Sequence, residues 1–160
     1  GYSWFSGTDE TGWDIEKTRV GIHQLLADIR SEGFSPKNIF LIGFSQGASL
    51  AMEIALRLPF AIGGIVPIAG FIKYRDTLSN EATKESKATP VLLLHGSQDE
   101  IIHVIASEKA HDFFKERGNP VYFKRYDGGH KIPKRTGPII KSFISDSFNF
   151  FRLNSSDSLN

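Results

Sequence analysis

The feature that most constrains the fold is a serine set between two glycines, directly after a short apolar run. Ile39–Ile42 is followed by Gly43-Phe44-Ser45-Gln46-Gly47, and the residues after this motif have a composition typical of a helix. Where a strand turns this sharply into a helix, the residue at the centre of the turn has a strained backbone conformation. Glycines are needed beside it, because the strand and the helix cross there at close distance. The serine hydroxyl then stands above the sheet, beside the next backbone N–H. The pattern predicts a nucleophile elbow centred on Ser45.

Length and composition indicate one globular domain. The chain has 160 residues, of which 40% are hydrophobic and 23% are charged, values typical of globular proteins. The net charge of +1 gives no reason to expect nucleic acid as a partner. The chain contains no cysteine, which excludes a disulfide framework and a cysteine nucleophile. No apolar run has membrane-spanning length and no signal peptide is visible, so we expect a cytoplasmic protein.

Short apolar runs alternate along the chain with amphipathic helical patterns. We expect strands at 39–42, 65–68, 91–94 and 121–126, and helices at 14–32, 46–58, 107–117 and 138–151. This alternation predicts an α/β fold, with a mostly parallel sheet and helices on both of its faces.

The remaining segments are expected to be irregular. Residues 1–13 indicate a loop with aromatic anchors, and the polar stretch 73–90 indicates a surface loop or a small lid over the sheet. Residues 153–160 are rich in serine and asparagine and indicate a frayed tail. We therefore expect a single domain over 1–152.

Three residues suited to serine hydrolysis follow three of the predicted strands, in the order serine, acid, histidine. Ser45 follows the first strand, Asp99 the strand at 91–94, and His130 the strand at 121–126. Serine is a weak nucleophile at neutral pH, so a histidine must take its proton, and a carboxylate must hold that imidazole in the useful tautomer. Because chemistry in such sheets gathers beyond the carboxyl ends of the strands, the order predicts a catalytic triad.

Each member also has a plainer interpretation. Ser45 could cap the helix that follows it, and Asp99 and His130 could lie on solvated loops. Asp127 is a rival acid, although it is close in sequence to His130, and His103 is an alternative base. No histidine spacing indicates a metal site and no phosphate-binding glycine pattern is present, so we expect no cofactor.

Nearly the whole chain, from about Tyr2 to Phe151, resembles the phospholipase/carboxylesterase family of α/β-hydrolases, which includes the acyl-protein thioesterases. The motifs that carry this resemblance are Gly43–Gly47, His95-Gly96 with Asp99, Gly129-His130 and Trp4-Phe5. The resemblance implies an α/β-hydrolase fold and cleavage of carboxylic esters or thioesters. It makes Ser45 the nucleophile, Asp99 the acid and His130 the base, and it implies that the Gln46 N–H forms one half of the oxyanion hole.

The front of the family fold has no counterpart in this sequence. Members of the family begin with several further strands, and one of the following loops carries a His-Gly motif that supplies the second oxyanion donor. The only His-Gly here is His95-Gly96, which comes after the nucleophile. We therefore expect a truncated domain in which Ile39–Ile42 is an apolar sheet edge, able to pair with a second copy of the chain.

An acyl substrate needs apolar side chains beside the serine. Four such residues in or next to the predicted strand-end loops are candidates for an acyl groove: Trp4, Phe71, Ile102 and Ile132. We therefore expect a small-molecule or lipid ester as substrate. Two alternatives remain: a dienelactone-hydrolase-like or peptidase-like enzyme with the same triad, and a non-catalytic module.

Overall fold

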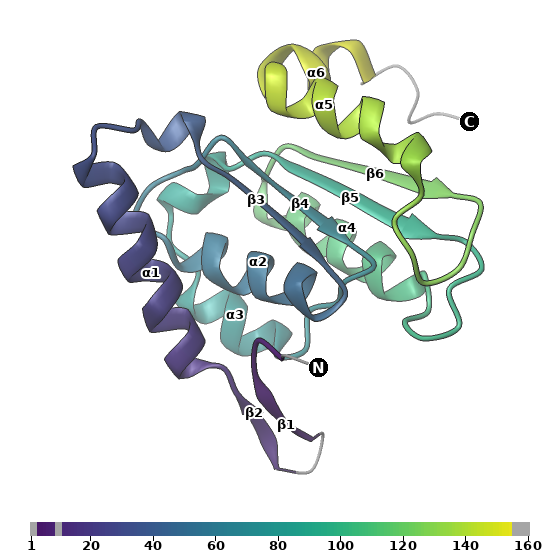
Figure 1. Cartoon of the computed structure of the whole chain (residues 1–160), viewed down its shortest axis with the longest axis horizontal. Helices are drawn as coiled ribbons and strands as arrows, with labels where there is room; N and C mark the ends of the chain where they lie inside the picture. Colours follow the sequence, from purple (N-terminus) through teal and green to yellow (C-terminus); the bar gives the residue numbers. More distant parts are fainter. Residues whose placement is uncertain (1–2, 9–10, 155–160) are drawn as a thin grey trace.

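The computed structural model describes residues 3–8 and 11–154. Its centre is a parallel sheet with the strand order β3-β4-β5-β6. These strands are β3 (Phe40–Phe44), β4 (Gly64–Ile68), β5 (Val91–Gly96) and β6 (Val121–Tyr126). The helices are α1 (Glu16–Ser31), α2 (Gln46–Arg57), α3 (Arg75–Glu81), α4 (Ile105–Arg117), α5 (Gly137–Ser145) and α6 (Ser147–Asn154). Figure 1 shows α1 to α4 on one side of the sheet and α5 with α6 on the other.

Alternate residues of the central strands build two separate cores. In β5, Leu93 packs into the core under α2 and α4, whereas Leu92 and Leu94 pack toward Phe143 of α5. Every residue of β4 and β5 is buried, as expected for strands covered on both faces. The predicted α/β architecture, a parallel sheet with helices on both of its faces, is therefore confirmed.

Helix ends follow the expected chemistry. Gly118 ends α4 in the left-handed region, with φ at 87°, and its N–H donates to the Lys115 carbonyl 3.0 Å away. Gly33, after α1, has φ at 94°. Glycine is the residue that tolerates this conformation best, and it satisfies the last carbonyls of a helix. The expected C-terminal ends of these two helices, at 32 and 117, are correct to within one residue, whereas their starts, expected at 14 and 107, lie at Glu16 and Ile105.

The N-terminal segment is not the expected loop. Ser6–Thr8 (β1) and Gly12–Asp14 (β2) form an antiparallel hairpin, which projects below α2 in Figure 1. Trp13 holds this hairpin in place, because its ring packs against those of Phe5 and Phe71, with centroid distances of 4.7 and 5.1 Å. The prediction of aromatic anchors is thus correct for Phe5 and Trp13, whereas residues 1–2 lie outside the described part.

The stretch 73–90 is also more regular than expected. It contains α3 and a short 3₁₀ helix, Glu85–Ala88. The side chain of Leu78 is fully buried in the core beside α2, and Glu81 bonds the Arg57 guanidinium at 2.7 Å. The segment therefore covers α2 and is neither a loop nor a lid over the sheet.

The single helix expected over 138–151 is two helices. The chain leaves the helical conformation at Asp146, where φ is −160°, and the Asp146 carboxylate then accepts the Asn149 N–H at 3.0 Å at the start of α6. This capping contact is typical of a helix N-terminus. Helix α6 continues to Asn154, past the expected start of the tail at 153, and residues 155–160 lie outside the described part.

Within residues 3–8 and 11–154, β3 forms one edge of the sheet, as the sequence predicts. Ile42 is 52% exposed there. An apolar groove of about 440 Å³ runs along this edge, between β3, α1, α2 and Trp4. In the same part of the chain, no helix is long and apolar enough to cross a bilayer.

Candidate active site

Ser45 lies in the turn between β3 and α2, in the strained conformation that the sequence predicts. Its φ is 55° and its ψ is −119°, a region that non-glycine residues rarely occupy. Its N–H donates to the Ile68 carbonyl of β4 at 2.8 Å. Its carbonyl accepts the N–H groups of Ala48 and Ser49, at 3.0 and 3.2 Å. These bonds hold the strained turn between the sheet and the first turn of α2.

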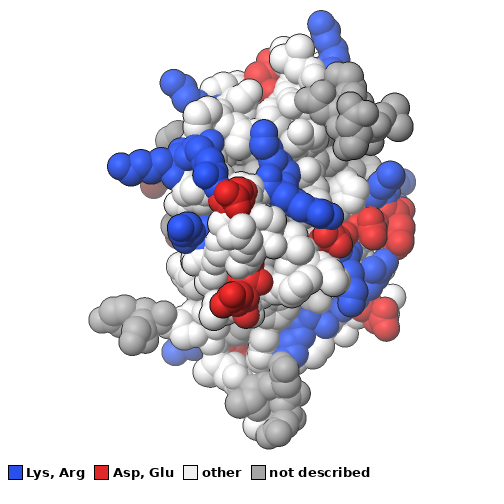
Figure 2. Space-filling view, turned by 90° about the vertical axis from the view of Figure 1, so that its right-hand side faces the viewer, with Lys and Arg blue, Asp and Glu red and all other residues white. Residues whose placement is uncertain are grey.

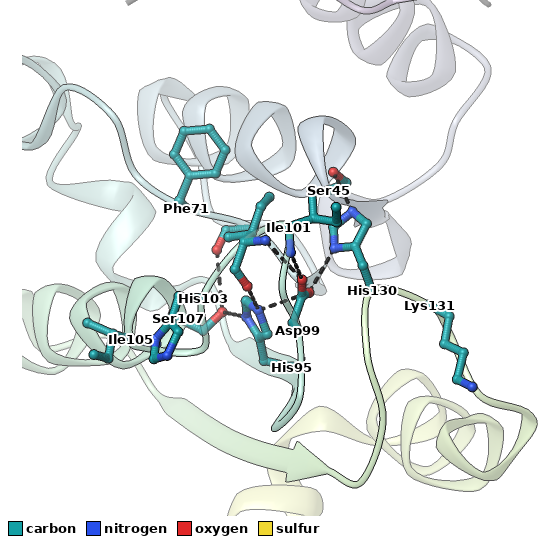
Figure 3. Close-up of polar contacts among 12 residues, drawn as sticks. Ser45, Phe71, His95, Asp99, Ile101, His103, Ile105, Ser107, His130 and Lys131 are labelled. Atoms are coloured by element: carbon teal, nitrogen blue, oxygen red, sulfur yellow. Dashed lines mark hydrogen bonds and ion pairs between the residues drawn. The ribbon is translucent and has the colours of Figure 1, made fainter.

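The loops after β5 and β6 bring an acid and a histidine to this serine (Figure 3). His130 Nε2 lies 3.0 Å from Ser45 Oγ, and His130 Nδ1 lies 2.7 Å from Asp99 Oδ2. The Phe44 ring packs against the imidazole with 4.7 Å between ring centroids. The structure thus brings together all three residues of the predicted triad in the geometry of proton transfer from serine to histidine.

The Asp99 side chain is fully buried, and both of its carboxylate oxygens have hydrogen-bond partners. Its Oδ1 accepts the N–H groups of Ile101 and Ile102, both at 2.9 Å. Burial raises the pKa of Asp99, but the hydrogen bonds from His130, Ile102 and Ile101 outweigh it and hold the pKa below the usual aspartate value. Asp99 therefore stays ionised at neutral pH and can orient the His130 imidazole through the bond to Nδ1.

The rival residues lie elsewhere. Asp127 accepts a hydrogen bond from Gln98 Nε2 at 2.9 Å. His103 accepts the Ile105 N–H at 3.4 Å and lines a cavity beyond Phe71, and Figure 3 shows its ring away from Ser45. In the described ranges, no three metal-ligating side chains gather in one place.

The Gln46 side chain has a role that the sequence did not reveal. Its Oε1 accepts the Trp4 N–H at 2.8 Å and the Ser3 hydroxyl at 2.9 Å, and its Nε2 donates to the Phe5 carbonyl at 2.9 Å. It therefore fastens the N-terminal segment beside the nucleophile. Only its position next to the serine, in the Phe-Ser-Gln motif, could have drawn attention to it.

The four apolar candidates are spread over different surroundings. Phe71 lines a cavity of about 200 Å³ that includes Ser45 and Gln46, and it also lines the cavity of about 450 Å³ toward α4. Trp4 lies in the groove along β3. Ile102 bonds Asp99 through its backbone, and Ile132 is half exposed after His130. Of the four, the structure places Phe71 in the cavity that contains Ser45.

Figure 2 views the end of the molecule to which the strands run, where basic side chains gather on the part nearest α5 and α6. Five basic residues of the sequence bracket His130: Lys124, Arg125, Lys131, Lys134 and Arg135. Arg125 is paired with Glu108, and Figure 3 shows the Lys131 side chain directed away from Ser45. Arg125 and Lys131 are therefore not directed at the serine.

Comparison with known proteins finds relatives among carboxylesterases and acyl-protein thioesterases. Carboxylesterase SOBER1 of Arabidopsis thaliana is 30% identical over 151 residues, which are 89% of this chain and 66% of that protein. Acyl-protein thioesterase 1 of Kluyveromyces lactis is 34% identical over 122 residues, 71% of this chain and 54% of the thioesterase. The crystal structure of Arabidopsis thaliana SOBER1 superposes with a TM-score of 0.81 at 29% identity, over 89% of this chain and 72% of that one.

This chain therefore spans between about half and two-thirds of the length of these curated relatives. The model of the phospholipase/carboxylesterase family matches residues 3–148, which include the elbow and the loops that carry Asp99 and His130. The motifs that suggested the resemblance lie within that match. The chain belongs to the phospholipase/carboxylesterase family.

Proposed function

We propose that this chain is a serine hydrolase that cleaves carboxylic esters or thioesters through an acyl-enzyme intermediate. The observation that carries the proposal is the unbroken hydrogen-bond series from Ser45 Oγ to His130, at 3.0 Å, and from His130 to Asp99, at 2.7 Å. Membership of the family supports the same chemistry.

In this mechanism His130 Nε2 takes the hydroxyl proton while Ser45 Oγ attacks the substrate carbonyl carbon. Asp99, held ionised by its hydrogen bonds, orients the imidazole and stabilises its positive charge. His130 then returns the proton to the leaving oxygen or sulfur. A water molecule, activated by the same histidine, attacks the acyl-enzyme and releases the carboxylic acid. These steps need no cofactor.

The Gln46 N–H is the proposed oxyanion donor. It belongs to the first turn of α2, where backbone N–H groups have no partner within the helix and the helix dipole favours negative charge. In acyl-transfer enzymes a single donor of this kind contributes about 10²–10³ in rate.

The test is labelling with a fluorophosphonate, read by intact mass. The wild-type chain is expected to take one adduct, because the Ser45–His130 pair makes the hydroxyl nucleophilic, and Ser45→Ala is expected to take none. A folded wild-type chain without an adduct would contradict the proposal. The non-catalytic module would then be the better description.

The substrate is proposed to be a small-molecule or lipid ester whose acyl group lies against Phe71, in the space it shares with Ser45. Trp4, Ile102 and Ile132 are further candidates at greater distance from this space. Profiling esters, thioesters and peptides separates this proposal from a dienelactone-hydrolase-like or peptidase-like enzyme. The carboxylesterase and thioesterase relatives favour esters.

Phe71→Ala is expected to shift the preference toward longer acyl chains by roughly tenfold in relative kcat/KM. The reason is that Phe71 borders both the Ser45 cavity and the cavity of about 450 Å³, so removing its ring joins the two. The measurement is kcat/KM on p-nitrophenyl esters of increasing length, with the exposed Phe148→Ala as control. An unchanged profile would remove Phe71 from the acyl site.

The exposed edge of β3 is the proposed contact of a homo-oligomer. Among residues 3–8 and 11–154 no strand pairs with the outer edge of β3, so this edge and the half-exposed Ile42 can pair with the same strand of a second copy. Light scattering is expected to show a dimer for the wild-type chain and a monomer for Ile42→Lys. A monomeric wild type at the same concentration would contradict this.

A cytoplasmic location is also part of the proposal, and cell fractionation tests it.

A further inference from the structure

A second histidine, His95, lies against the proposed catalytic carboxylate. Figure 3 shows Asp99 between two imidazoles, His130 on one side and His95 on the other. His95 is near the end of β5 and its side chain is fully buried. Its Nε2 lies 3.3 Å from Asp99 Oδ2, the same oxygen that His130 contacts. The mechanism described above gives His95 no role.

The partners of His95 define its tautomer. Its Nε2 lies 2.7 Å from the Ile102 carbonyl oxygen, which can only accept, so Nε2 carries the hydrogen. Its Nδ1 lies 2.7 Å from Ser107 Oγ and, in the neutral ring, accepts the serine hydroxyl. Both ring nitrogens are thus used, and the Nε2–H is directed at Ile102 with the Asp99 carboxylate close by.

Ile102 connects this contact to the orientation of Asp99. Its N–H donates to Asp99 Oδ1, while its carbonyl accepts from His95. The segment 97–104, between β5 and α4, contains no helix or strand, and backbone hydrogen bonds together with the side chains of Asp99 and His95 hold it in place. The terminal torsion of an aspartate is soft, and a small rotation of the carboxylate would turn Oδ2 away from His130. Because both side chains are fully buried, their electrostatic interaction is strong, and the fixed Nε2–H opposes that rotation.

We infer that His95 is a positioning residue, whose Nε2–H holds the Ile102 carbonyl and the Asp99 carboxylate so that Oδ2 faces His130. Its catalytic consequence rests on the proposed function. Ser107, in the first turn of α4, fixes the imidazole from the other side. The effect of His95 on the reaction passes entirely through Asp99, because it touches neither Ser45 nor the space beside it.

The kinetic test compares His95→Leu with His95→Gln. Leucine removes both ring contacts, and kcat per active site titrated with fluorophosphonate is expected to fall about tenfold with KM unchanged. Glutamine extends an N–H to about the place of Nε2 and is expected to recover most of that loss. His111→Leu, the same exchange at a histidine on α4 outside the site, is the control and is expected to keep the wild-type kcat.

Titration of active sites separates positioning from a merely structural role, because misfolded molecules reduce the number of sites and leave kcat per site unchanged. An unchanged kcat per site in His95→Leu would overturn the inference. An equal loss in both His95 variants would do the same, since it would show that the Nε2–H is not the group that matters.

If neither variant folds, a measurement on the wild-type chain decides whether His95 Nε2 carries the hydrogen that the inference requires. In a long-range ¹H–¹⁵N spectrum with labelled histidine, the His95 ring is expected to carry a hydrogen on Nε2. A hydrogen on Nδ1 alone would overturn the inference, because Nε2 could not then donate to Ile102 or Asp99. This spectrum does not depend on activity. A wild-type chain that takes no fluorophosphonate would end the proposed function, and the spectrum would still decide the contact.

Discussion

Asp99→Asn is expected to lower kcat for ester hydrolysis by about 10⁴-fold, the loss known for this exchange in a serine protease triad. The hydrogen bonds at the site explain why. Oδ1 accepts two backbone N–H groups, from Ile101 and Ile102, so the oxygen of an asparagine must take that position. Its NH₂ group then faces His130, which has to turn into the tautomer with a hydrogen on Nε2. That histidine is unable to accept the proton of Ser45.

The matched control is Asp127→Asn, which removes the other carboxylate near His130 in sequence. Because Asp127 bonds Gln98 in this structure, its replacement is expected to leave kcat within about threefold of wild type. Steady-state kinetics on a p-nitrophenyl ester, with folding checked by circular dichroism, decides whether Asp99 or Asp127 is the acid of the triad. A large loss in Asp127→Asn with little change in Asp99→Asn would reverse the assignment of the acid.

The centre of the sheet could be predicted from the sequence because β4 and β5 are buried on both faces, and such strands are short uninterrupted apolar runs. The edge strand β6 is more exposed, yet the strand expected at 121–126 coincides with it. The order of the site residues could be predicted for a related reason. Parallel strands place their carboxyl ends at one edge, so residues that directly follow three strands must be neighbours.

The parts that escaped prediction depend on contacts between distant residues. The hairpin of β1 and β2 is held by Trp13 against Phe5 and Phe71, and no local pattern records that contact. Helix α3 has seven residues and one buried side chain, Leu78, too few to produce a helical period. At Asp146 the chain leaves the helix, and the Asp146 side chain caps the next helix, although the apolar pattern of the sequence continues across this position.

The same limit applies within the site. Gln46 and His95 act through side-chain bonds to Phe5 and Ile102, and neither bond follows from residue type or spacing. Apolar character alone made Ile102 and Ile132 look equivalent to Phe71. In the folded chain, only Phe71 of these three lines the cavity that contains Ser45.

Gly43→Ala is expected to destabilise the fold by about 3 kcal/mol and to lower Tm by about 10 °C. A Cβ at this position would lie 2.1 Å from the Gly47 carbonyl oxygen and 2.6 Å from the Ala48 nitrogen. Both are backbone atoms in the first turn of α2, so no side chain can turn aside. Relief requires α2 to move away from β3, and that movement would also displace Ser45 from His130.

Gly21→Ala is the control, because a Cβ there, on the surface of α1, meets nothing within 4 Å. Removing a glycine from a helix interior is expected to stabilise the fold by about 0.5–1 kcal/mol, so the two exchanges should move Tm in opposite directions. Thermal unfolding together with the rate of fluorophosphonate labelling measures both effects. A Gly43→Ala chain with the wild-type Tm and labelling rate would show that the strand and helix are not in contact at the elbow. The strained conformation of Ser45 would then need another cause, since the crossing of β3 and α2 is what imposes it here.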